Sequence, residues 1–219
     1  MKKIISILLS VILLLSFAAC SNSTNDNGST ESTQNQTVSE SSEQTGKILI
    51  AYFSRAGENY GVGTIEKGNT EIVAEMIAEK YENADLFKIE TNYTYPESYD
   101  EATKAAKSEQ DSNARPELKN TVDNFENYDT IFIGYPIWYA DMPMAVYTFL
   151  ESYDFSDKTV IPFCTHAGSG LASTVDNIKK ELLSANVMQG LAILGTEVQN
   201  NQSQINSDLD DWLSNLEIK

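Results

Sequence analysis

Short runs of mostly apolar residues alternate along this chain with stretches in which apolar residues recur at helical spacing. Each run is long enough for one strand, and in order they are 47–53, 84–89, 129–135, 159–164 and 191–194. Their hydrophobicity is largely continuous, which is typical of strands buried on both faces of a parallel sheet. The stretches between them, such as 69–81 and 205–216, carry apolar stripes. The pattern predicts a three-layer α/β fold with a mainly parallel, five-stranded sheet. Pro162 lies inside the fourth run and predicts a bulge or a strand end there.

Charge and composition exclude several classes of function. The chain carries 15 Lys and Arg against 32 Asp and Glu, a formal net charge of −17. Such a balance argues against a basic patch that binds nucleic acid or anionic lipid headgroups. A single histidine, His166, excludes poly-His metal sites, and two cysteines exclude thiolate-rich zinc and four-cysteine iron–sulfur centres. We therefore predict no metal site and no nucleic-acid partner. Cys164, at a strand end, is expected to be a small buried hydrophobe.

The first 45 residues predict export and attachment. Residues 1–19 combine two early lysines, an apolar stretch and small residues, the pattern of a signal peptide. Cys20 follows two alanines and resembles the lipid-modified cysteine of bacterial lipoproteins; the alternative is an ordinary secreted protein with an incidental cysteine. Residues 20–45 are almost entirely polar and predict a flexible tether. We expect one domain, 46–219, outside the cytoplasm and anchored to the cell membrane through Cys20.

Three loops follow strands that should end at the same edge of the sheet, where ligands bind in folds of this class. The first, 54–70, leads from a strand into a helix and is rich in glycine, hydroxyl and amide residues. Unpaired N–H groups at a helix N-terminus suit a phosphate. The spacing matches neither a Walker nor a dinucleotide-binding fingerprint. The alternative is that Asn69 or Thr70 only caps the helix.

The other two loops carry aromatic and glycine residues. The loop at 134–143 places Trp138 and Tyr139 between prolines, where they would cover something flat or fill the gap between loop and helix. The loop at 165–170 contains two glycines, which allow a backbone to approach a ligand closely.

Taken in order, these segments resemble the flavodoxin family. The likeness is carried by Ala51–Ser54 with Gly68–Thr70, by Gly134–Trp138 and by Pro162–Gly170, and it covers nearly all of 46–219. It is closest to a flavodoxin-like lipoprotein branch whose third loop reads Tyr-Pro-Ile-Trp followed by an aromatic residue. The resemblance implies strand order 2-1-3-4-5 and bound FMN, a cofactor that carries the electrons while the protein positions it.

The resemblance assigns a role to each matching position. Five residues would hold or shape the phosphate site: Ser54, Arg55, Gly68, Asn69 and Thr70. Four would form one wall of the flavin ring pocket: Pro136, Ile137, Trp138 and Tyr139. Five would approach its other side: Thr165, His166, Gly168, Ser169 and Gly170. His166 is a weak catalytic candidate, as a proton donor beside the flavin; the alternative is that it only orders the loop that follows it.

The first loop departs from the family pattern. Thr70 lies sixteen residues after Ser54, whereas the compact family loop has five, so eleven residues are inserted. Tyr60, within the insertion, would fold over the flavin or line an opening for a partner. The aromatic segment 92–99 would wall the pocket or pack on the surface.

Three classes of function follow. The first is an FMN electron-transfer protein or a small FMN-dependent NAD(P)H:acceptor reductase of quinone type, working with a redox partner protein or a small electron acceptor. The second is a non-catalytic nucleotide- or flavin-binding lipoprotein. The third, a hydrolase using Ser169 and His166, ranks last because the serine lacks a nucleophile-elbow motif.

Overall fold

The structure is a computed structural model that describes residues 46–216 and 218. The expected signal peptide at 1–19, the lipidation at Cys20 and the tether at 20–45 lie outside the described residues. The strands are β1 (Lys47–Tyr52), β2 (Gly57–Asn59), β3 (Gly63–Ile65), β4 (Ala84–Lys88), β5 (Tyr128–Pro136), β6 (Thr159–His166), β7 (Asn186–Val187) and β8 (Leu191–Leu194). The helices are α1 (Asn69–Ala78), α2 (Tyr99–Asp111), α3 (Met144–Ser152), α4 (Thr174–Glu181), α5 (Gly195–Asn200) and α6 (Gln202–Ser214), with a 3₁₀ turn at Phe125–Asn127.

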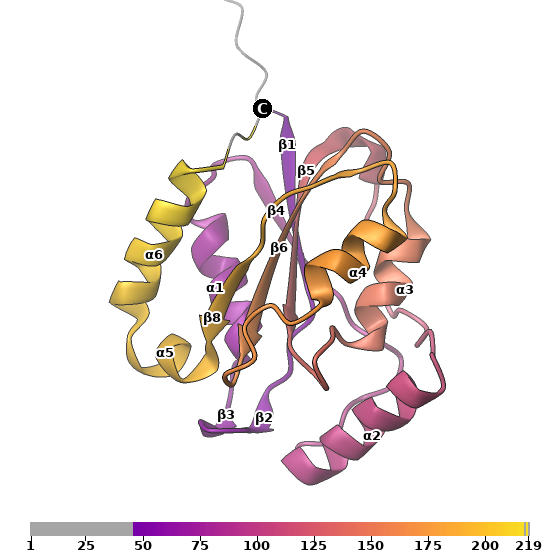
Figure 1. The fold of residues 1–219 in the computed structure, drawn as a ribbon, viewed down its shortest axis with the longest axis vertical. Helices are drawn as coiled ribbons and strands as arrows, with labels where there is room; N and C mark the ends of the chain where they lie inside the picture. The colour runs from indigo at the N-terminus through magenta and orange to yellow at the C-terminus, as the bar shows by residue number, and fades with distance from the viewer. Residues whose placement is uncertain (1–45, 217, 219) are drawn as a thin grey trace, which may run out of the picture. The chain divides into compact units, whose positions relative to one another are not determined.

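The central sheet is parallel and runs β4-β1-β5-β6-β7, with β8 also paired to β6 (Figure 1). This confirms the α/β fold, and the order matches 2-1-3-4-5 when β7 and β8 share the fifth position. Within the described chain the sheet therefore has six strands rather than the predicted five.

Pro162 explains why the fifth position is divided. Strand β6 runs through it without a bulge on the β5 side, where Pro162 is in register with Ile133. On the other side, the Met188 N–H donates to the Val160 carbonyl oxygen over 2.9 Å, and a Cβ on Gly190 would lie 3.0 Å from the Pro162 oxygen. Pro162 has no N–H to donate to this neighbour. The expected strand end thus falls in the neighbouring strand rather than in β6.

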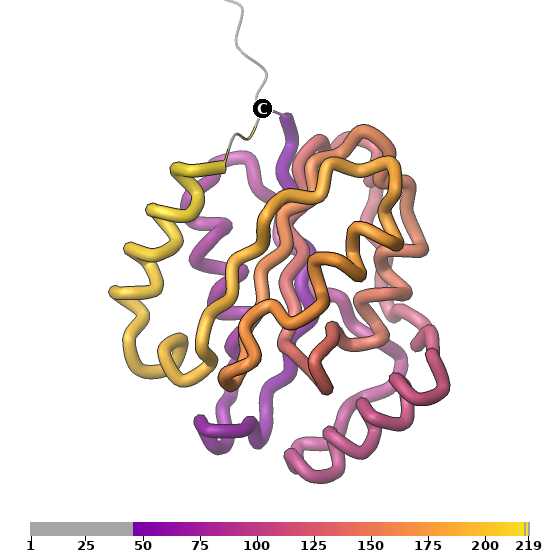
Figure 2. The backbone as a smooth tube through the Cα atoms, in the orientation of Figure 1, coloured from indigo at the N-terminus to yellow at the C-terminus, as the bar shows by residue number. Residues whose placement is uncertain are grey.

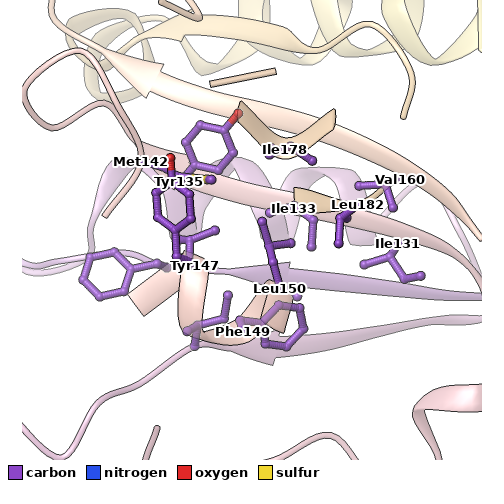
Figure 3. Close-up of a cluster of buried hydrophobic side chains, with 14 of the residues drawn as sticks. Ile131, Ile133, Tyr135, Met142, Tyr147, Phe149, Leu150, Val160, Ile178 and Leu182 are labelled. Atoms are coloured by element: carbon purple, nitrogen blue, oxygen red, sulfur yellow. The ribbon is translucent and has the colours of Figure 1, made fainter. Parts of the chain in front are cut away.

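Helices cover both faces of the sheet (Figure 2). Alternate β1 residues point to opposite sides: Ile48 and Ile50 belong to the hydrophobic cluster under α1 and α6, and Leu49 and Ala51 to the cluster under α3 and α4. Figure 3 shows the second cluster, which includes the fully buried Tyr135 and Phe149 side chains. No helix in the described part of the chain is long and apolar enough to cross a bilayer.

Two regions differ from the sequence pattern. The stripe expected at 205–216 forms most of α6, and the shorter helix α5 precedes it. The insertion after β1 forms an antiparallel hairpin, β2–β3, which the pattern does not predict. Cys164 is fully buried, as expected, and burial raises the pKa of its thiol to about 12.

Candidate cofactor site

A cavity of about 560 Å³ lies at the carboxyl ends of β1, β5, β6 and β8. The side chains and backbone that line it include eleven of the predicted site residues: Ser54, Arg55, Asn69, Thr70, Pro136, Ile137, Trp138, Tyr139, Thr165, His166 and Ser169. The predicted Gly68, Gly168 and Gly170 do not line it. Further residues, which the sequence did not assign to the site, also line the cavity: Asn59, Gly61, Ala102, Thr103, Ala106, Ala140, Ala167, Leu194, Gly195 and Thr196.

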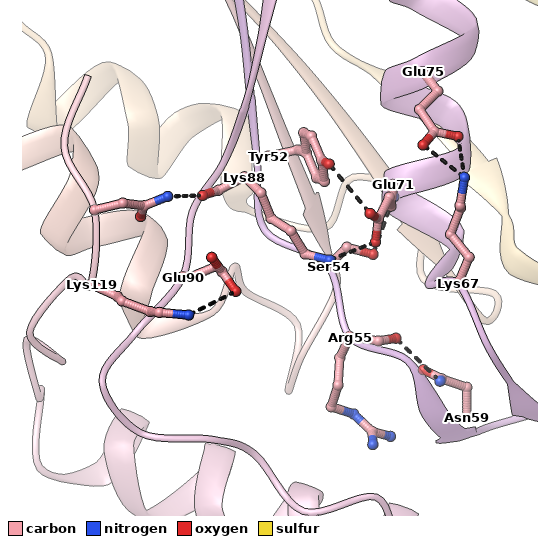
Figure 4. Close-up of polar contacts among 11 residues, drawn as sticks. Tyr52, Ser54, Arg55, Asn59, Lys67, Glu71, Glu75, Lys88, Glu90 and Lys119 are labelled. Carbon is pink, nitrogen blue, oxygen red and sulfur yellow. Dashed lines mark hydrogen bonds and ion pairs between the residues drawn. The ribbon is translucent and has the colours of Figure 1, made fainter. Parts of the chain in front are cut away.

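The N-terminus of α1 forms one end of the cavity. Gly68 is its N-cap and no side chain within the helix caps it. The cap comes from the loop before it, since the Ser54 hydroxyl oxygen accepts the Glu71 N–H over 3.1 Å (Figure 4). A Cβ on Gly68 would lie 2.2 Å from that oxygen, so this approach requires glycine. Gly68 therefore shapes the site without lining it.

Asn69 and Thr70 do not cap α1, so the capping alternative is wrong. The Asn69 side-chain oxygen accepts a hydrogen bond from the Gln199 amide over 2.7 Å. The Thr70 hydroxyl is buried and lies 2.8 Å from the Thr165 hydroxyl, which joins α1 to β6 beneath the cavity. The N–H groups of a helix's first turn have no acceptor within the helix. Those of Asn69 and Thr70 are therefore suited to bind an anion.

A carboxylate near this helix end is neutralised. Glu71, in the first turn of α1, would repel an anion bound at the N-terminus. The Lys88 ammonium lies 2.7 Å from the Glu71 carboxylate, which is mostly buried (Figure 4). The pair reduces the negative charge that a phosphate would meet.

The loop after β5 is a tight, strained turn. Trp138 and Asp141 exchange backbone hydrogen bonds of 2.8 and 3.0 Å. Between them, Tyr139 and Ala140 have φ of 50° and 61°. Positive φ costs a non-glycine residue on the order of 1 kcal/mol and is concentrated at functional sites.

Trp138 both fills the gap beneath this loop and lines the cavity. Its ring packs edge-to-face on Phe53 and Tyr95, at centroid distances of 5.3 and 5.2 Å. Tyr139 remains about half exposed, and its hydroxyl donates to the Thr103 carbonyl oxygen over 3.1 Å. The gap-filling alternative therefore holds for Trp138, and both aromatics line the cavity. That they cover something flat stays a prediction.

His166 orders the loop that follows β6. Its Nδ1 accepts the N–H groups of Gly168 and Gly170 over 2.9 and 3.2 Å. This assigns the proton of the neutral ring to Nε2, and burial lowers the pKa of His166. With Nδ1 occupied and Nε2 protonated, the ring has no free lone pair to act as a base for Ser169, which argues against the hydrolase.

The inserted hairpin is fixed to α2 by polar contacts. The Arg55 guanidinium donates to the Pro96 carbonyl oxygen over 2.9 Å and also to the carbonyls of Glu97 and Glu58. Burial lowers the pKa of Arg55. The Glu58 carboxylate accepts the Tyr99 N–H at the start of α2 over 3.0 Å. Arg55 therefore shapes the loop, where both of its terminal nitrogens donate to carbonyl oxygens.

The tip of the hairpin lies at the cavity. The ring of Tyr60 is 67% exposed and its centroid is 6.0 Å from that of Tyr99. A Cβ on Gly61 would lie 3.5 Å from the Thr196 methyl group. The insertion thus reaches from α2 towards α5 along the rim.

The aromatic segment 92–99 divides between its two alternatives. Tyr93 is exposed, Tyr95 packs under Trp138 and donates to the Glu109 carboxylate over 2.8 Å, and Tyr99 lines the cavity.

The lining is almost free of charge. Among the described residues that line the cavity, Arg55 alone is charged at neutral pH, although 21% of the chain is Asp, Glu, Lys or Arg. No group of three or more His, Cys, Asp or Glu able to hold a metal occurs within the described ranges. Although the protein is acidic, no carboxylate occurs among the described residues that line this cavity. Such a lining suits an anionic ligand with a flat aromatic part.

Comparison with known proteins identifies the family of the chain. A scan against protein families matches residues 47–216 to the family described as Flavodoxin. The chain belongs to the flavodoxin family. A search of curated proteins returned no match.

Solved structures of flavoproteins are similar to this flavodoxin. A candidate flavoprotein from Bacteroides eggerthii is 27% identical with a TM-score of 0.63, over 79% of this chain and 99% of that chain. One from Bacteroides uniformis is 27% identical with a TM-score of 0.59, over 77% and 98%. A flavoprotein from Lactobacillus acidophilus, solved in complex with FMN, is 25% identical with a TM-score of 0.55, over 70% and 97%.

Proposed function

We propose that this flavodoxin binds FMN in the cavity and transfers electrons through it to a redox partner protein or a small acceptor. The observation that carries the proposal is the joining of a helix N-terminus, an aromatic turn and an uncharged lining at the carboxyl edge of a flavodoxin sheet. The FMN-bound structure of the similar Lactobacillus acidophilus protein supports the choice of cofactor.

The phosphate end of the site uses neutral donors. The N–H groups of Asn69 and Thr70 bind the phosphate, and the helix dipole favours its negative charge. The Ser54 oxygen already accepts the Glu71 N–H, so its own hydrogen is available to donate. No lysine is required, because charge-assisted hydrogen bonds from several N–H and O–H groups hold an anion well.

The ring end of the site uses the two loops after β5 and β6. Trp138 and Tyr139 provide apolar aromatic surface on one side. His166 keeps the other loop in place and presents an Nε2 donor. Bound FMN supplies one- and two-electron chemistry, and the protein supplies its position and surroundings.

An absorbance spectrum of the purified chain tests the cofactor. We expect bound oxidised FMN, bleached by dithionite and restored by air. A protein that remains colourless after FMN is added would refute the proposal. Turnover of NAD(P)H and a quinone would identify a reductase. Without that turnover, electron exchange with a redox protein would identify a carrier, and bound FMN that exchanges electrons with neither would favour the non-catalytic flavin-binding alternative.

We also propose that the protein is exported and tethered to the cell membrane by a lipid on Cys20. The support is the signal-like pattern of residues 1–19 and the polar composition of 20–45. Cell fractionation and mass spectrometry test it: the wild type should sediment with membranes and begin at a lipid-modified Cys20. Cys20→Ser should remove the lipid, and an unmodified wild-type cysteine would refute the idea.

A further inference from the structure

Helix α5 contacts the N-terminus of α1 through two side chains that lie 130 positions apart in the chain. Val198 of α5 is fully buried in the hydrophobic cluster that also contains Val73 of α1. The next residue, Gln199, is half-buried, and its side-chain amide donates to the Asn69 side-chain oxygen over 2.7 Å. Gln199 therefore stands on an element fixed by the core, and its partner is the first residue of α1.

This hydrogen bond determines which end of the Asn69 amide remains available. The oxygen of an asparagine amide only accepts hydrogen bonds, and its nitrogen only donates them. Gln199 holds the oxygen, and the NH2 group has no acceptor among residues 46–216 and 218. Asn69 lines the cavity at the N-terminus of α1. An unused donor therefore lies at the end of the cavity that suits a phosphate.

Gly195, at the start of α5, makes room for this NH2 group. A Cβ at that position would lie 2.6 Å from the Asn69 nitrogen, so any other residue would displace the amide. Gly195 also lines the cavity. Helix α5 thus acts on Asn69 at two points, because Gln199 binds the oxygen and Gly195 leaves space for the nitrogen.

We propose that Gln199 is a positioning residue for the FMN phosphate: by holding the Asn69 oxygen, it directs the Asn69 NH2 group to the phosphate. The inference rests on the proposed function. The orientation matters because an anion attracts the N–H dipoles of an amide and repels its oxygen. Without the Gln199 donor, the amide can turn its oxygen towards the phosphate. Riboflavin has no phosphate and gains nothing from this donor, so Gln199 contributes to selectivity for the phosphorylated flavin.

Two substitutions at Gln199 separate the hydrogen bond from the packing of the side chain. Gln199→Met is similar in size but neither donates nor carries charge, and Gln199→Glu has the same shape but only accepts. Gln204→Met and Gln204→Glu are the matched controls. The Gln204 amide donates to the exposed Asp208 carboxylate over 2.8 Å, on α6 and outside the cavity lining.

Each variant of the full chain is titrated as apo-protein with FMN and, separately, with riboflavin, by quenching of flavin fluorescence. The measured quantity is the selectivity ratio, the Kd of riboflavin divided by the Kd of FMN. A residue that only supported the fold would change both constants and leave this ratio unchanged.

We expect Gln199→Met to weaken FMN binding by about fivefold, the size of one net hydrogen bond, and to change riboflavin binding by less than about twofold. Gln199→Glu should weaken FMN binding by about tenfold or more, because the carboxylate turns the Asn69 nitrogen towards itself and also repels the phosphate. Gly195→Ala should lower the selectivity ratio as well, with Gln199 intact. Both Gln204 variants should keep the ratio of the wild type.

The Met variant is decisive, because added charge alone would weaken FMN binding in Gln199→Glu. An unchanged selectivity ratio in Gln199→Met would overturn the inference, as would a wild-type ratio in Gln199→Glu or an equal fall in the Gln204 controls. A wild type that does not bind FMN would instead refute the proposed function, and its own titration shows this before any variant is compared.

Discussion

Ser54→Ala tests the phosphate site most directly. Two changes follow from its geometry. The Glu71 N–H loses its acceptor at 3.1 Å, and the phosphate loses one hydroxyl donor. Loss of an N-cap acceptor costs about 0.5–2 kcal/mol of stability. Loss of a hydrogen bond to a charged group costs about 1.5–3 kcal/mol, which corresponds to roughly 10- to 150-fold in affinity.

The assay compares FMN with riboflavin, which lacks the phosphate. Quenching of flavin fluorescence, titrated with apo-protein, yields both dissociation constants. We expect FMN to bind roughly 10- to 150-fold more weakly to Ser54→Ala, and riboflavin to bind almost as it does to the wild type. Urea denaturation of the apo-protein should show the smaller loss of stability separately.

Ser152→Ala is the matched control, because that hydroxyl donates only within α3, to the Thr148 carbonyl oxygen. It should alter neither flavin. Equal weakening of FMN and riboflavin binding by Ser54→Ala would contradict this role, since the serine would then not act through the phosphate. An unchanged FMN affinity would contradict it as well.

Three further predictions concern the apo-protein, each measured by urea denaturation. Burial lowers the pKa of His166 in the folded protein, so the imidazole binds a proton more tightly in the unfolded chain. The free energy of unfolding should therefore fall as pH drops from about 6.5 through the lower folded pKa. An equally steep fall in a His166→Asn variant would contradict this. Thr165→Val should lower the free energy of unfolding by about 1–3 kcal/mol, because the buried Thr70 hydroxyl loses its partner. Adding Thr70→Val should recover part of that stability, and an equal or larger loss in the double variant would contradict the prediction. Gly134→Ala should cost at least about 1–3 kcal/mol, because its Cβ would lie 2.2 Å from the Phe163 ring; a variant as stable as the wild type would show that the ring yields freely.

The main features of the sheet could be predicted because they are local in the sequence. The runs at 129–135 and 159–164 are continuous and apolar, and they form the buried centre of β5 and β6. Parallel strands all end at one edge. That rule alone brings Ser54, Trp138 and His166 to one cavity, although they are far apart in the chain.

The extra walls of the cavity could not be predicted, because long-range contacts set them. Glycines at 57, 61 and 63, with φ of 86°, 78° and 72°, do indicate turns in the insertion. The position of the hairpin, however, depends on contacts from Arg55 and Glu58 to residues 96–99. For the same reason the sequence of α2 predicts only an ordinary polar helix. It does not show that the two buried alanines, Ala102 and Ala106, face the cavity.

The sequence correctly predicts that Pro162 disturbs the sheet, but the disturbance falls between β7 and β8 and not in β6. A proline does disturb a ladder of hydrogen bonds, as the sequence indicates. The side on which the missing N–H falls depends on the orientation of the strand. In this protein it faces the gap between β7 and β8.

The start of the domain and the mouth of the cavity lie at opposite poles of the sheet. Gly46 precedes β1 and Ser54 follows it, and the strand between them spans roughly 20 Å at 3.3 Å per residue. In the tethered form proposed above, an anchor would therefore pull on the pole remote from the flavin. Attachment and electron exchange would thus use opposite ends of the same strand, so neither would have to displace the other.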